Sequence, residues 1–144
     1  MGAWDIGPFD SDDSVDWLFE FFRTPGLLAV DRAFDGVESG GPAGIDAPTA
    51  SNAWVAAEVL AALSGQPAAS LPGPIRHWSR WNRWRKMATV RRRERAIRVL
   101  GKILAGSELA DLWKESPYGD RWEASVRELQ HRLRASLPAG SSAA

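Results

Sequence analysis

The chain has 144 residues, and its 18 basic and 18 acidic residues give a formal net charge of zero. A chain of this length folds as one domain with a sizeable core, and a composition of 44% hydrophobic and 25% charged residues excludes wholesale disorder. The absence of cysteine excludes disulfides and thiolate metal sites. No signal peptide and no long apolar run are visible, so we expect a cytoplasmic protein without a membrane span.

The zero net charge is the sum of two large opposite charges. Residues 1–72 contain 2 basic and 11 acidic residues, whereas residues 73–144 contain 16 basic and 7 acidic residues, which gives net charges of −9 and +9. Two interpretations follow: the halves pair with each other inside one fold, or they mark surfaces for a charged partner. We favour internal pairing, and the second interpretation stays open.

Apolar residues at helical spacing predict helices throughout, and almost no segment alternates as a strand would. The first helix is expected to begin at the capping residues 11–13 and to end at Thr24-Pro25-Gly26. Its buried face is predicted from the i, i+3, i+4, i+7 spacing and comprises Val15, Leu18, Phe19 and Phe22, widened by Trp17 and Phe21.

The middle of the chain predicts two helices separated by loops. A short apolar helix is expected over 27–34, followed by a Gly- and Pro-rich loop over 35–48. Thr49 or Ser51 is expected to cap an Ala-rich helix that runs to Leu63 and stops at Gly65. Residues 66–74 are predicted to form a Pro-rich linker.

The second half predicts further helices over 75–87 and 90–104, and a short one over 108–115 that Ser107 caps. In the short helix, Leu109, Leu112 and Trp113 are expected to face inward. Asp120 and Glu123 have the spacing of a capping box for the last helix. That helix carries the cleanest amphipathic stripe in the chain, made of Trp122, Val126, Leu129, Leu133 and Leu137.

These elements predict an all-α fold, a compact bundle of five or six helices with an irregular N-terminal segment. Residues 1–137 are expected to form a single helical domain, and residues 138–144 a frayed C-terminal tail.

The chain begins with a motif made of Trp4, Gly7, Phe9, Asp10 and Asp12, and Asp16 follows in the first predicted helix. This motif resembles the pattern W-x-x-G-x-F-D-N-D, followed by a helix with a further Asp, of a bacterial family of small domains, the domain of unknown function 4259. Ser11 stands in place of the usual Asn. The segments 53–63 and 107–115, and Trp122 with its helix, also look like the family. The resemblance implies a mostly helical bacterial domain and brings no established activity.

The acidic motif is the first candidate site. Asp10, Asp12, Asp13 and Asp16 supply the hard oxygen ligands that divalent cations prefer, but the spacing lacks the glycine and terminal glutamate of a calcium loop. We favour a structural role, in which Phe9 and Trp4 plug the core and Asp10 or Asp12 caps the helix. We therefore predict no metal and no cofactor.

The second candidate is the basic segment 76–98, which holds ten Lys or Arg residues, three Trp and one acid, Glu94. Such a segment suits the phosphates and unpaired bases of a nucleic acid, an acidic protein surface or anionic lipid. Alternatively, some Trp rings fill the core while the arginine heads reach the acidic half. The candidate partner-binding residues are Arg76, Trp78, Arg80, Trp81, Arg83, Trp84, Arg85, Lys86, Arg91, Arg92 and Arg93.

Neither His77 nor His131 has a nucleophile or acid at a recognisable catalytic spacing, so we predict no catalytic residues and no enzymatic activity. We expect a non-enzymatic interaction protein, an accessory or immunity-type factor that binds a protein partner of unknown identity. The alternative is nucleic-acid binding through residues 76–98. The charge split also permits head-to-tail self-association, so the oligomeric state stays open.

Overall fold

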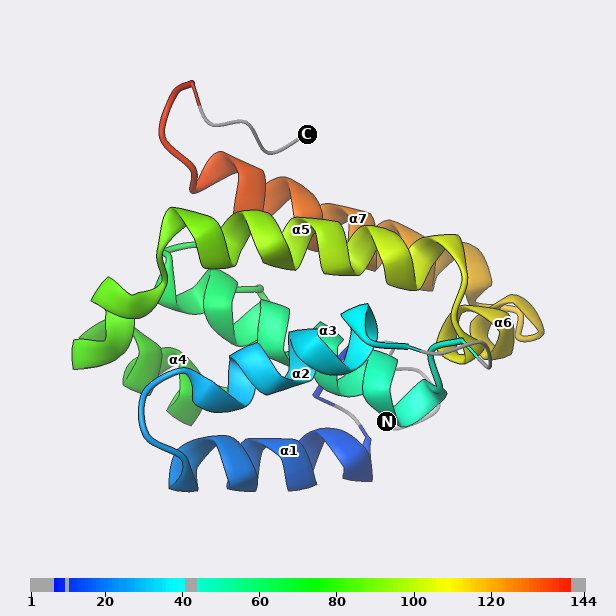
Figure 1. The fold of residues 1–144 in the computed structure, drawn as a ribbon, viewed down its shortest axis with the longest axis horizontal. Helices are drawn as coiled ribbons and strands as arrows, with labels where there is room; N and C mark the ends of the chain where they lie inside the picture. The colour runs from blue at the N-terminus through cyan, green and yellow to red at the C-terminus, as the bar shows by residue number, and fades with distance from the viewer. Residues whose placement is uncertain (1–6, 10, 41–43, 141–144) are drawn as a thin grey trace.

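The computed structural model describes residues 7–9, 11–40 and 44–140, and these residues form seven α-helices, one 3-10 helix and no strand (Figure 1). The all-α prediction is therefore confirmed. The count of five or six helices was too low, because even short stretches such as the seven-residue α6 fold as separate helices. The elements are α1 (Asp12–Arg23), α2 (Leu28–Glu38), α3 (Ala47–Leu63), α4 (Gly73–Trp81), η2 (Arg83–Met87), α5 (Val90–Ala105), α6 (Glu108–Lys114) and α7 (Gly119–Ala135).

Helix α3 is the centre of the domain. It contacts α1, α2, α4, α5, α6 and α7, and nearly all of its side chains are buried, as is expected of a helix that is apolar on every side. Its many alanines let the surrounding helices approach closely. In Figure 1, α5 and α7 lie side by side on one side of α3 and α1 lies on the other, while α2 lies in front of α3 and contacts both α1 and α5.

The prediction that Thr49 or Ser51 caps α3 was wrong. The helix begins earlier, at Ala47, because Pro48 is well suited to a first turn and Asp46 precedes it as the cap. The Asp46 carboxylate accepts a hydrogen bond from the Thr49 amide at 2.8 Å, and its bonds with Thr49 lower the pKa of Asp46. The predicted stop at Gly65 is confirmed, since this glycine has a φ of 84° and follows the last turn of α3.

The predicted core face of α1 was right for Trp17 and Phe21 and wrong for Val15, Phe19 and Phe22. Ser14, Trp17 and Phe21 are the buried residues, whereas Val15, Phe19 and Phe22 are exposed. On the buried side, the Ser14 hydroxyl donates to the Pro8 carbonyl, and the Trp17 and Phe21 rings stack at 5.4 Å. The predicted helix start is confirmed, because the Ser11 side chain accepts from the Ser14 amide.

Two predictions near α6 and α7 failed as well. Leu112 is 52% exposed, not buried. Helix α7 begins at Gly119 without a side-chain cap, so Asp120 and Glu123 form no capping box. The reason is the register of the helix: Tyr118 occupies the N-cap position, so Asp120 already lies inside the first turn. The stripe of α7 is confirmed, with Leu137 half-buried and the other four residues buried.

A buried ion pair joins α3 to α7 and thereby the acidic half to the basic half. Arg132 donates to both carboxylate oxygens of Glu58, at 3.0 and 2.9 Å, and also binds Glu128 on its own helix. Glu58 is only 2% exposed. Burial raises the pKa of Glu58, although the hydrogen bonds from Arg132 act in the opposite direction.

Candidate interaction surface

The backbone from α4 to η2 places part of the basic segment at one end of the molecule. Pro74 lies in the first turn of α4, where its missing amide proton costs nothing. The helix stops after Trp81, because the Asn82 side chain accepts from the Trp84 amide at 2.7 Å and starts η2. The expected single helix over 75–87 is therefore two short helices with a break at Asn82.

The three tryptophans around this break differ in exposure. The Trp78 and Trp84 rings are half-buried and pack edge-on against Phe21, with centroids 5.4 and 6.1 Å away. Trp81 is 73% exposed, and the Arg80 guanidinium lies 5.7 Å from its ring centroid. Two of the three rings thus fill the core, as the structural interpretation expected, and one remains available to a partner.

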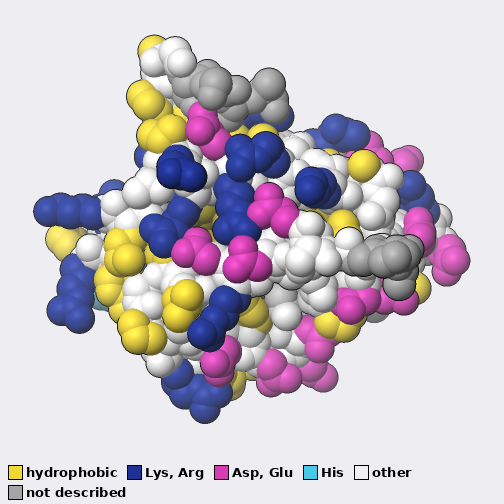
Figure 2. All heavy atoms as spheres, in the orientation of Figure 1, with side chains coloured by type: hydrophobic (Ala, Val, Ile, Leu, Met, Phe, Trp, Pro, Cys, Tyr) yellow, Lys and Arg dark blue, Asp and Glu magenta, His cyan; other side chains and the backbone are white. Residues whose placement is uncertain are grey.

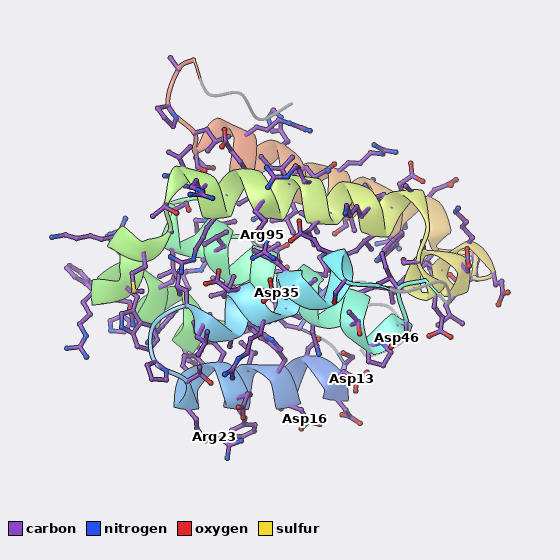
Figure 3. The ribbon with its side chains drawn as sticks, in the orientation of Figure 1. Asp13, Asp16, Arg23, Asp35, Asp46 and Arg95 are labelled. Atoms are coloured by element: carbon purple, nitrogen blue, oxygen red, sulfur yellow. The ribbon has the colours of Figure 1, made fainter. Side chains whose placement is uncertain are left out.

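Three of the five arginines of α5, Arg92, Arg93 and Arg95, are bound within the fold. Arg92 donates two hydrogen bonds to Asp31 of α2, at 2.9 and 2.8 Å, and these bonds raise the pKa of Arg92. Arg95 binds Glu38 at 2.7 Å and also Asp35 (Figure 3). Arg93 instead donates to the carbonyl oxygens of Ala88 and Ser136. Internal pairing of the two halves is therefore confirmed for α5.

Among the residues that the structure describes, the cations of α4 and η2 have no such carboxylate partners. Arg76 and Arg85 donate only to backbone carbonyl oxygens, among them those of Ala68 and Arg80. In the part of the chain that the structure describes, Arg80, Arg83 and Lys86 lie within ion-pair distance of no acid. We name the exposed group at this end the basic end; it comprises Arg80, Trp81, Arg83 and Lys86.

Two hollows adjoin the basic end and share Arg85. One has a volume of about 460 Å³ and lies against the end of α3, between η2 and Arg93. The other, of about 280 Å³, lies between α4 and the segment after α3. Neither is lined by an acidic residue; the cations around them are Arg76, Arg80, Arg83, Arg85, Lys86 and Arg93. The surroundings therefore suit an anionic group.

A second surface lies on α1, where the sequence predicted core. Val15, Phe19 and Phe22 are 45%, 65% and 45% exposed and follow one another at helical spacing, so they form a stripe that we name the α1 strip. Asp12, Asp13 and Asp16 are exposed at the start of the same helix, and we name them the acidic end. The figures place Asp13 and Asp16 at one end of α1 and Arg23 at the other (Figure 3).

The α1 strip continues toward the basic end. The Phe22 ring meets the Trp78 ring of α4 edge-on at 5.3 Å. The Met87 side chain lies over Gly26, where a Cβ would come within 2.9 Å of its methyl carbon. Figure 2 shows acidic side chains gathered below and to the right, basic side chains at the left end, and hydrophobic side chains between them.

The motif at the N-terminus is only partly described. Trp4 and Asp10 lie outside the described residues. Phe9 is half-buried against the core, as expected of a plug, whereas Asp12 and Asp16 are exposed on α1. Ser11, not an aspartate, provides the helix cap. Within 7–9, 11–40 and 44–140, no three His, Asp or Glu side chains are grouped to ligate one metal ion.

Comparison with known protein families identifies the family of this chain. The family model of the domain of unknown function DUF4259 matches residues 2–125. The chain belongs to the DUF4259 family. The match extends beyond the N-terminal motif through α6 and into α7, so the basic segment lies within the family domain. No curated protein and no solved structure matches the chain. None of the helices that the structure describes is long and apolar enough to cross a membrane.

The sequence indicated the basic segment 76–98, which contains the basic end, but it predicted the residues of the α1 strip as core. Six apolar or aromatic positions could not all face one core on a helix of 12 residues, but the spacing alone gave no way to choose between two overlapping faces. The acidic residues give a usable signal, because Asp12, Asp16 and Glu20 alternate with the strip at helical spacing.

Proposed function

We propose that this DUF4259 protein is a non-enzymatic interaction protein, an accessory or immunity-type factor of the bacterial cytoplasm that binds a protein partner. One observation carries the proposal. Seven large hydrophobic side chains are exposed among the described residues, and all but Leu112 gather on α1, at the start of α2 or on α4 and η2. These six are Val15, Phe19, Phe22, Leu28, Trp81 and Met87.

The composition of this surface is that of a protein interface. Aromatic residues, methionine and arginine are enriched in interfaces and include most of the side chains that dominate binding energy. Contiguous exposed apolar patches on soluble domains mark sites of interaction. The charged groups at both ends would add association rate and specificity to the affinity that the apolar side chains provide.

Affinity capture from an extract of the native cell tests this proposal. We expect the wild-type protein to retain a specific partner and Phe19→Glu to lose it, because a charge replaces the most exposed ring of the α1 strip. Leu112→Glu is the matched control, since this leucine is 52% exposed but lies on α6, away from the α1 strip. Equal capture by all three proteins would contradict a docking role for α1.

The hollows beside the basic end favour nucleic-acid binding as a second candidate function. Six cations surround them without an acid, and Trp81 is exposed with Arg80 beside it, which is the combination that phosphates and an unpaired base require. Fluorescence anisotropy with single- and double-stranded oligonucleotides at about 50 mM salt tests it. We expect Arg83→Glu with Lys86→Glu to abolish any binding, and no binding by the wild type removes this candidate.

A further inference from the structure

We propose that the partner covering the α1 strip is a second copy of this chain, in a closed dimer with two-fold symmetry. In that dimer, the acidic end of each copy faces the basic end of the other, and the two α1 strips meet between them. This inference rests on the proposed docking function of the surface, and it names the occupant.

The order of groups along the surface is the first argument. Nine residues of helix separate Asp13 from Phe22, a distance of about 13–14 Å at 1.5 Å per residue. Phe22 touches Trp78, and Trp81 follows one helical turn later on α4. The surface therefore runs from acid through apolar side chains to cations (Figure 2).

Such a surface is complementary to itself. A two-fold rotation about an axis through its apolar middle reverses its direction, so each acidic end meets a basic end and the apolar parts meet each other. Interfaces in symmetric dimers are of this kind, with the same patch used on both copies. A partner of another sequence would have to reproduce both the apolar strip and the reversed order of charges, which a second copy supplies by symmetry alone.

The net charge of the chain favours the same occupant. At a formal net charge of zero, two copies do not repel each other over long distances, and proteins near zero charge associate more readily. The local charges remain available to orient the encounter, because Arg80, Arg83 and Lys86 have no ion-pair partner among the described residues. The same holds for Asp12, Asp13 and Asp16.

Two charge-reversed variants test the arrangement. Asp13→Lys with Asp16→Lys makes both ends of the surface positive, and Arg83→Glu with Lys86→Glu makes both ends negative. We expect the wild type to form a dimer in sedimentation equilibrium, at twice its 15.8 kDa, and each variant alone to dimerise at least about tenfold more weakly. An equimolar mixture of the two variants should recover the dimer, because every end then meets its opposite.

A second pair of variants tests the apolar part. We expect Phe19→Glu to weaken the wild-type dimer at least about tenfold and Leu112→Glu to leave it unchanged, with thermal unfolding showing that both variants are folded. A dimer that Phe19→Glu leaves intact, a mass that rises beyond two copies, or a mixture that stays monomeric would each overturn the proposed interface.

The outcome is separable from that of the proposed function. A wild type that remains at 15.8 kDa up to about millimolar concentration overturns self-association. In that case, loss of a heterologous partner from Phe19→Glu, with retention by Leu112→Glu, still supports a docking surface on α1. If capture is also indifferent to Phe19→Glu, both proposals fail.

Discussion

The two parts of the basic segment carry five cations each and have opposite fates. In α5, Arg92 and Arg95 bind carboxylates of α2, and Arg93 binds carbonyl oxygens. In α4 and η2, Arg80, Arg83 and Lys86 meet no carboxylate within the described residues. The difference lies in what each part faces and not in the arginines themselves.

Helix α2 presents Asp31, Asp35 and Glu38 at positions i, i+4 and i+7, which is one face of a helix, and α5 lies against that face. The hollow between η2 and α3 is instead lined by Leu63 and Ser64, at the end of α3, which offers carbonyl oxygens. Net charge per segment therefore does not tell how much charge a partner can use; the neighbouring helix decides it.

The largest expected effect comes from the most deeply bound cation. Arg132→Ala should lower the free energy of unfolding by about 3–5 kcal/mol, because it leaves the Glu58 carboxylate buried without its partner. Urea unfolding followed by circular dichroism measures the change. Arg134→Ala is the control, since Arg134 is exposed on the same helix, and a similar loss from both variants would contradict the role of burial.

The tryptophans sharpen the comparison within α4 and η2. Trp84→Ala should lower the free energy of unfolding by about 2 kcal/mol or more, because its ring packs on Phe21 and Trp78. Trp81→Ala should change it by less than about 0.5 kcal/mol, because this ring is 73% exposed. Comparable losses in thermal and urea unfolding would show that Trp81 is part of the core.

The arginines give a smaller effect of the same kind. Arg92→Ala and Arg95→Ala should each cost about 1 kcal/mol, the upper range for partly exposed ion pairs, whereas Arg83→Ala should cost less than about 0.5 kcal/mol. The difference should shrink at about 1 M salt, where charges are screened within about 3 Å. Equal losses of stability from Arg83→Ala and from the two α5 variants would contradict the comparison. A difference that does not change with salt would contradict it as well.

The parts of the fold that sequence predicted are those that local chemistry decides. The Ser107 cap, the Gly65 stop and the α7 stripe depend on residues a few positions apart, and each is confirmed. The all-α fold class was predicted from the same local spacing of apolar residues.

The predictions that failed depend on packing between distant residues. Which side of α1 faces inward is decided by Trp78 and Trp84, more than fifty residues later in the chain. Likewise, no local pattern tells that Arg92 finds Asp31 while Arg83 finds no acid. The basic segment 76–98 was therefore named from sequence. Its exposed part, the basic end, and the α1 strip became visible only in the folded chain.

The smallest expected effect comes from the protonation of Glu58, the carboxylate that Arg132 binds. Burial raises the pKa of Glu58 above its ordinary 4.5, so the folded chain holds the proton more tightly than the unfolded chain does. The contribution of Glu58 to stability is then fully present below about pH 4.5 and is lost as the pH rises through the raised pKa. Glu58→Gln keeps the size of the side chain and does not titrate. We therefore expect the free energy of unfolding of the wild type, minus that of Glu58→Gln, to fall over this range in urea titrations at several pH values. A difference that rises with pH would mean that Arg132 outweighs burial and that the deepest ion pair of the fold is stabilising in its charged form.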